Sequence, residues 1–206
     1  SGSHYGNNYI DSFLSPYPLT NDGLVNGPSR DSIALTIDMC PSSKGISSEV
    51  YERLEALFEV TLYSVPVGIA MTRSWLKRWP KEFNYIKSLQ LSGRLDVTWI
   101  NHSSNHRYAR KQPLETNFLL MENTDMEDEV LGNEVALIEN GVTPSVYFRF
   151  PGLVSDYDTV QYVAQLGLIT LGSNAWLGKG QEPQFGSIIL IHGNRNEVVG
   201  EKKLFK

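Results

Sequence analysis

The chain has 206 residues, of which 41% are hydrophobic and 20% are charged, and its formal net charge is −5. This length and balance predict a globular protein with one full core, and the interspersed acidic and basic residues lack the basic footprint of a nucleic-acid-binding protein. No apolar stretch approaches the roughly 18 residues that a membrane-spanning helix needs, so we expect no integral membrane segment.

The N-terminal residues are expected to contribute little to the fold. Residues 1–4, with the sequence SGSH, resemble the remnant of an expression tag. Residues 5 to about 30 are rich in Asn, Ser, Pro and Gly and show no hydrophobic period. We therefore predict an irregular arm over residues 1–30 and a single domain over residues 31–206.

Strands and helices are predicted to alternate from residue 33 onward. An apolar, β-rich run over residues 33–37 ends at Asp38, and a turn follows at residues 40–42. A later helix is predicted to have Thr124 as its N-cap and Glu127 as the partner in a capping box. In chain order, the further predicted elements are helix 47–58, strand 67–71, a helical stretch over 75–92 broken near Pro80, strand 95–100, helix 125–140, strand 145–148, helix 157–166, strand 168–171 and strand 188–191.

This alternation predicts an α/β fold with a mainly parallel sheet or barrel. Because the chain is too short for eight full β/α pairs, an irregular or incomplete (β/α) barrel fits better. In such folds, functional sites form at the carboxyl ends of the strands.

Four residues with chemical potential directly follow predicted strands and would therefore meet at one rim. They are Asp38, His102, Arg149 and His192. The alternative is that each one satisfies a loop structurally. His102 and His106 are four residues apart, a spacing that would let both imidazoles reach one metal ion from one face of a helical turn.

These segments, in this order, resemble the sequence motifs of the polysaccharide deacetylase family, which is carbohydrate esterase family 4 with its NodB-like domain. The family's Thr-Phe-Asp-Asp-Gly-Pro motif corresponds to TIDMCP at residues 36–41, and its His-Ser/Thr-x-x-His motif is matched by HSSNH at residues 102–106. Its Arg-x-Pro motif is matched at residues 149–151 and its Leu-x-His motif at residues 190–192, whereas its Asp-Trp pair is replaced by AW at residues 175–176.

The resemblance implies a role for each matched residue. Asp38 would be the general base, Arg149 would orient it, and His192 would be the general acid. His102 and His106 would bind a divalent metal, expected to be zinc, and Asp38 could also complete the metal shell.

The sequence departs from the family pattern at two aspartates. Met39 stands where the family has an anionic metal ligand, and a thioether is a poor substitute for a carboxylate. Ala175 stands where the family has the aspartate that supports the acidic histidine, so His192 is expected to lack a carboxylate partner. Cys40, the only cysteine, is either a small buried thiol that fills the turn or a thiolate that supplies the missing negative ligand. The chain ends soon after His192, so a final helix is expected to be missing or trimmed.

The implied activity is a metal-dependent hydrolysis that removes N- or O-acetyl groups from an acetylated polysaccharide or peptidoglycan. Trp176, Pro151 and Tyr147 are the candidate substrate-binding residues, although Trp176 could equally belong to the core. The substrates of the family imply an extracytoplasmic location. The alternative function is a catalytically impaired module that binds a glycan and does not hydrolyse it.

Overall fold

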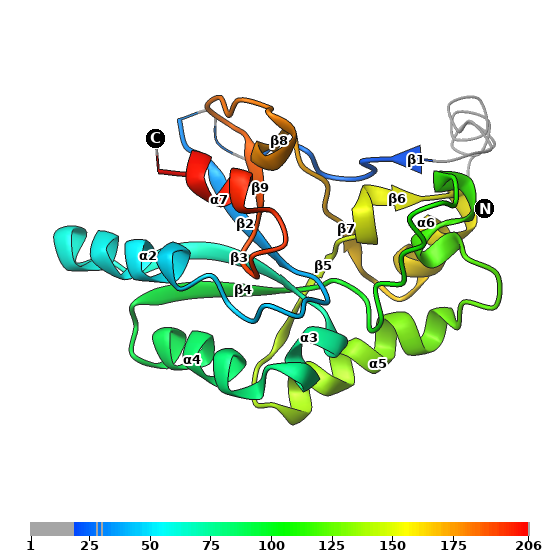
Figure 1. The fold of residues 1–206 in the computed structure, drawn as a ribbon, viewed down its shortest axis with the longest axis horizontal. Coiled ribbons are helices and arrows are strands. Elements are labelled where there is room, and N and C mark those ends of the chain that lie inside the picture. Colours follow the sequence, from blue (N-terminus) through cyan, green and yellow to red (C-terminus); the bar gives the residue numbers. More distant parts are fainter. Residues whose placement is uncertain (1–18, 28, 30, 206) are drawn as a thin grey trace, which may run out of the picture.

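The computed structural model describes residues 19–27, 29 and 31–205, and its centre is a curled sheet (Figure 1). Seven strands form this sheet in the order β7-β5-β4-β3-β2-β9-β8, and each neighbouring pair is parallel. The predicted α/β fold with an incomplete barrel is therefore confirmed. The strands of the sheet are β2 (Ala34–Met39), β3 (Val65–Met71), β4 (Leu95–Asn101), β5 (Pro144–Phe148), β7 (Ile169–Thr170), β8 (Ala175–Trp176) and β9 (Ile188–His192).

Helices cover the outer face of the sheet and bury the main core against it. In Figure 1, α4 and α5 lie along the face below β4, and α7 lies beside β9. The core is formed by apolar residues that alternate along the strands, such as Ile37, Met39 and Ile69, and by the apolar stripes of the helices. The helices are α2 (Ser48–Thr61), α3 (Arg73–Arg78), α4 (Pro80–Leu91), α5 (Met126–Glu139), α6 (Tyr157–Gln165) and α7 (Val198–Lys203), with short 3₁₀ helices at Leu114–Thr116, Phe118–Leu120, Pro151–Leu153 and Leu177–Lys179.

The described part of the N-terminal segment pairs with the domain. β1 (Leu19–Thr20) is antiparallel to β6 (Val154–Ser155) in a separate two-stranded sheet. Leu24 then forms a parallel bridge with Leu171, and Asn26 forms an antiparallel bridge with Ser187. These pairs tie residues 19–26 to both sides of the half-barrel. Residues 1–18 of the predicted irregular arm lie outside the described residues.

Three details differ from the sequence-based expectations. The N-cap of α5 is Asp125, whose carboxylate accepts the Asp128 N–H at 3.0 Å, and not Thr124. The helix therefore begins one residue later, so Glu127 does not occupy the third helical position that a capping box requires. A short final helix, α7, of six residues is present where the sequence led us to expect a missing or trimmed one. Among the described residues, no helix has the length and apolar character needed to cross a membrane.

Parallel pairing brings the ends of the central strands to one rim. β2 pairs with β9 so that Asp38 lies opposite His192. β4 ends at Asn101, directly before His102, and β5 ends at Phe148, directly before Arg149. Four segments that are distant in the sequence thus deliver polar side chains to the same edge of the sheet.

Candidate active site

A cavity of about 700 Å³ opens at this rim. Trp176, Gly152, Leu153 and Tyr108 contribute to its wall, and Trp176 is half-buried there rather than part of the closed core. The predicted Pro151 is buried beneath the wall, and its neighbours Gly152 and Leu153 line the cavity instead. The cavity contains most of the predicted chemical residues, namely Asp38, Cys40, His102, His106 and His192.

Tyr147, which was predicted to contact substrate, lies elsewhere. It packs with Ala70, Ile100 and Leu171 in the interior of the half-barrel, because its side chain points inward from β5 before the rim is reached. The sequence placed Tyr147 correctly on its strand, but the distance of that strand position from the rim depends on the register of the sheet.

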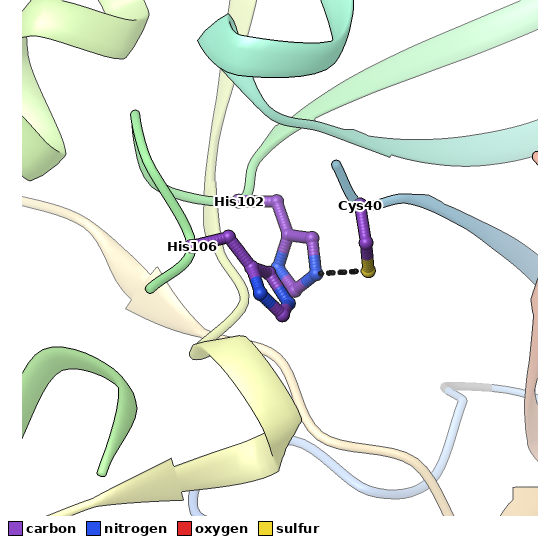
Figure 2. A group of neighbouring side chains, drawn as sticks. All are labelled: Cys40, His102 and His106. Carbon is purple, nitrogen blue, oxygen red and sulfur yellow. Dashed lines mark hydrogen bonds between the residues drawn. The ribbon is translucent and has the colours of Figure 1, made fainter. Parts of the chain in front are cut away.

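His102 and His106 converge in a tight turn (Figure 2). The turn is not helical, since Ser103 and His106 have positive φ values of 67° and 46°, which corrects the expected helical geometry. The ring centroids of the two histidines are 4.9 Å apart. The Nδ1 atom of His102 lies 2.8 Å from the Arg149 carbonyl oxygen, so its Nε2 atom faces the cavity.

A buried carboxylate from α5 holds the turn that carries these histidines. Glu129 is 2% exposed, and its two oxygens accept the Asn105 backbone N–H and the Asn105 side-chain amide, each at 2.9 Å. The Ser103 hydroxyl accepts the His106 N–H at 3.2 Å. The positions of both imidazoles are therefore set by α5 as well as by β4. Glu129 could not be identified from the sequence, because a lone glutamate on a helix carries no local signal for this contact.

Asp38 and Arg149 form a fully buried ion pair. Arg149 Nη1 lies 2.7 Å from Asp38 Oδ1 and 2.7 Å from the Thr36 hydroxyl, and Nη2 donates to the Gly172 carbonyl at 2.9 Å. Burial disfavours the anionic form of Asp38. The Arg149 guanidinium, with smaller contributions from His102 and His192, nevertheless holds the pKa of Asp38 below its ordinary value. Asp38 is thus an ionised carboxylate that Arg149 holds in one orientation.

His192 has a carboxylate partner, so the expectation that it lacks one is wrong. Glu197 Oε2 lies 3.2 Å from His192 Nδ1 and accepts the Trp176 indole N–H at 2.7 Å. Burial opposes protonation of His192, but Cys40, Glu197 and Asp38 together raise its pKa to about 11. Glu197 was missed because it follows the last motif, in a loop whose path depends on how α7 packs.

Met39 and Cys40 face opposite sides of the sheet. Met39 is fully buried in the main core, with its sulfur 3.4 Å from the Tyr51 hydroxyl. Cys40 faces the cavity, and its Sγ atom lies 3.5 Å from His102 Nε2 (Figure 2). Burial raises the pKa of the Cys40 thiol, but His106, His102 and His192 hold it well below its ordinary value.

The donor atoms of this rim suit a divalent metal. The ligand atoms of Cys40, His102 and His106 all lie within 4.8 Å of one another, and those of Asp38, Cys40 and His192 form a second such set. Nitrogen and sulfur donors at this spacing match the ligand chemistry of zinc. The histidine pair is therefore the part of the site that fits the metal expected from the sequence.

Comparison with known families agrees with these motifs. The family model described as polysaccharide deacetylase matches residues 26–171. The chain belongs to the polysaccharide deacetylase family. Members of this family act on acetylated polysaccharides. The match does not extend to residues 172–206, which carry Trp176, His192 and Glu197.

Solved structures of the same family share the fold. A family 4 carbohydrate esterase from Bacillus anthracis is 17% identical with a TM-score of 0.65, and the alignment covers 92% of this chain and 87% of that one. A chitin deacetylase from the fungal pathogen Colletotrichum lindemuthianum is 14% identical with a TM-score of 0.59, covering 91% and 85%. A family 4 pseudoenzyme from Bacillus anthracis is 13% identical with a TM-score of 0.60, covering 91% and 64%. The fold thus occurs both in a carbohydrate esterase and in a pseudoenzyme.

Proposed function

We propose that this protein is a metal-dependent deacetylase that hydrolyses N- or O-acetyl groups of an acetylated polysaccharide or peptidoglycan. One observation carries the proposal: an Arg149-bound carboxylate and a Glu197-bound histidine line one cavity together with the histidine pair. A base that must be ionised and an acid that must be protonated are thus each held in the required state.

The proposed roles follow from these contacts. His102 and His106 would hold the metal, which supplies polarisation of the acetyl carbonyl and activation of a water. Asp38 accepts the proton of the attacking water, and Arg149 keeps that carboxylate oriented. His192 donates a proton to the departing amine or alcohol from its Nε2 atom, because Glu197 occupies the Nδ1 side.

The wall of the cavity supports recognition of a sugar. The Trp176 ring lies 5.9 Å from the His192 ring, and Lys179 lies 3.7 Å from the centroid of the indole. Tyr108, which is 61% exposed, stacks on Phe118, and both rings line the same cavity. Aromatic rings in a cavity that also holds an acid and a base suit a pyranose ring. Because acetylated polysaccharides of this kind lie outside the cytoplasm, we propose an extracytoplasmic site of action.

The alternative is a module that binds an acetylated glycan without hydrolysing it. The observation that favours this alternative is the absence of a carboxylate at position 39, together with the existence of a pseudoenzyme of similar fold. The retained acid and base pairs favour the enzyme, because glycan binding alone requires neither a buried ion pair nor a paired histidine.

The decisive experiment measures acetate release by the zinc-loaded protein from acetylated chitin oligomers, peptidoglycan and acetylated xylan. We expect turnover of at least one substrate, and we expect Asp38→Asn to reduce it by about 10²-fold or more. Asp96→Asn, at an exposed position of β4, is the matched control and should keep full activity. Glycan binding without acetate release from any of these substrates would establish the binding module instead.

A further inference from the structure

We infer that the Cys40 thiolate is the third protein ligand of the metal, so that the site is Cys-His-His. The inference rests on the proposed function only in that both use the same histidine pair, His102 and His106, as metal ligands. It replaces the expectation that Asp38 completes the metal shell. A thiolate ligand is a property of this chain and not of the motif that the family carries.

The alternation of β2 places the thiol where a ligand is needed. Thr36, Asp38 and Cys40 have the same parity along the strand, whereas Ile37 and Met39 point into the main core. An aspartate directly after Asp38 would therefore enter the core in this structure, while the residue after that reaches the cavity. The negative ligand has thus moved by one position along the chain.

The distance between sulfur and nitrogen matches a shared zinc ion. With Zn–S of about 2.3 Å and Zn–N of about 2.05 Å, tetrahedral geometry separates the two donors by about 3.6 Å. The Cys40 Sγ to His102 Nε2 distance is 3.5 Å. Figure 2 shows this sulfur pointing at the His102 ring, beside which the His106 ring stands almost perpendicular. The ligand atoms of all three residues lie within 4.8 Å of one another, which brings them within reach of a single ion.

The surroundings fix each donor in the orientation that binding requires. His102 Nδ1 faces the Arg149 carbonyl oxygen, which leaves Nε2 for the metal. The side-chain amide of Asn194 donates to the Cys40 carbonyl oxygen, which anchors the backbone that carries the thiol. Cys40 is 6% exposed, so the sulfur is shielded from bulk water at the floor of the cavity that it lines.

Asp38 is better placed as a base than as a ligand. Its Oδ1 atom is engaged by Arg149 at 2.7 Å, and its Oδ2 atom lies 3.6 Å from His102 Nε2. Among the described residues, however, the set of ligand atoms within 4.8 Å of one another that contains both His102 and His106 includes Cys40 and not Asp38. A Cys-His-His shell leaves the fourth tetrahedral position open for water or substrate, as catalytic zinc sites require. Asp38 then lies beside that position, where a proton acceptor is needed. The soft donor also predicts selection of zinc or cobalt over magnesium and manganese.

Cobalt(II) spectroscopy of the full chain tests the ligand directly. Cys40 is the only cysteine, so a near-ultraviolet thiolate-to-cobalt charge-transfer band in the metal-free protein titrated with Co²⁺ has no other source. We expect this band in the parent and in Asn196→Ala, a cavity-lining control outside the ligand set. We expect its loss in Cys40→Ser, with zinc affinity reduced at least about 100-fold, since even outer-shell changes cost 10–100-fold.

A second variant protects the test against misfolding. Cys40→Asp should recover zinc affinity relative to Cys40→Ser while still lacking the charge-transfer band, because an oxygen ligand replaces the sulfur. A parent protein that binds no metal, or that binds cobalt without the band, overturns the inference, as does an unchanged zinc affinity in Cys40→Ser. An intact charge-transfer band without acetate release would refute the deacetylase function but not the thiolate ligand. Acetate release without the band would refute the thiolate ligand but not the deacetylase function.

Discussion

Single residues determine which donor atoms line the cavity. Cys40 and Met39 are neighbours in the chain, yet one faces the cavity and the other lies in the main core. The period of two along a strand fully accounts for this difference. An aspartate at position 39, which aligns with the family's second aspartate, would therefore alter the core and would not add a ligand to the proposed metal site.

Met39→Asp should destabilise the protein and leave zinc affinity no higher than in the parent. The new carboxylate would be buried among apolar side chains beside the Tyr51 hydroxyl, without a cationic partner. A buried, unpaired charge costs about 3–5 kcal/mol of unfolding free energy. Urea denaturation measures this loss, and Met39→Leu, which keeps the volume, should cost less than about 1.5 kcal/mol. Parent-like stability combined with tighter zinc binding in Met39→Asp would show that position 39 reaches the cavity after all.

Much of the site could be predicted from the sequence, because its residues follow strands and parallel strands end together. Asp38, Arg149, His102, His106 and His192 all meet at the predicted rim. The alternation in the TIDMCP segment also contained the information that Cys40 shares a face with Asp38, once the strand was extended by two residues. The contacts of Glu129 and Glu197 could not be predicted, since both carboxylates reach the site by tertiary packing.

At the level of elements, the final helix positions the carboxylate that lies beside the proposed acid. α7 begins directly after Glu197 and packs against β9. The buried Glu201 on this helix accepts the Ser47 hydroxyl at 2.7 Å and the Arg195 N–H at 3.0 Å, which anchors the loop between β9 and α7. Glu197 is thereby held beside His192, where we propose that it replaces the family aspartate that is Ala175 here.

Glu197→Gln should move the alkaline limb of the pH–rate profile to lower pH. His192 acts when protonated. Burial lowers the pKa of His192, but Cys40 and Glu197 are among the groups that raise it above its ordinary value. Loss of the carboxylate lowers that pKa, so the active form disappears at lower pH, by about one pH unit or more. The measurement is kcat/KM for acetate release across pH.

Ala175→Asp provides the contrasting variant. Ala175 is fully buried in β8, and His192 already has its carboxylate, so this substitution should leave the position of the alkaline limb unchanged while costing stability. If the alkaline limb shifts in Ala175→Asp but not in Glu197→Gln, Glu197 is not the functional partner of His192. The partner position would then be residue 175, as in the family.

The existence of the longer elements and of β7 followed from the sequence, whereas β6 and β8 did not. The break near Pro80 separates α3 from α4 as expected, because proline occupies the first turn of the second helix. β6 and β8 have two residues each, which is too short for any periodic signal. Their pairing is determined by neighbouring strands, so only the assembled sheet reveals them.

At the scale of the whole molecule, Arg149 joins parts of the half-barrel that are far apart in the chain. Its guanidinium reaches Thr36 and Asp38 on β2, and it also donates to the carbonyl oxygens of Leu171 and Gly172, which follow β7. β7 and β8 are the edges of the described sheet, so no strand pairing closes the curl between them. The buried guanidinium therefore serves the fold as well as the base.

Arg149→Met should lower the free energy of unfolding by about 3–5 kcal/mol, because it leaves Asp38 buried without its partner. Guanidinium chloride denaturation followed by circular dichroism measures the loss. Arg53→Met, which removes an exposed pair with Glu49, is the control and should cost at most about 0.5 kcal/mol. The double variant with Asp38→Asn should recover part of the loss.

In the parent, the paired carboxylate has a lowered pKa, so its contribution to the unfolding free energy is complete above pH 3.8 and disappears as the pH falls through that lowered pKa. In Arg149→Met, burial without the cation favours the protonated acid, so acidification should remove part of the difference between variant and parent. Equal unfolding free energies at neutral pH, or a difference that does not narrow in acid, would show that the ion pair does not hold the half-barrel together.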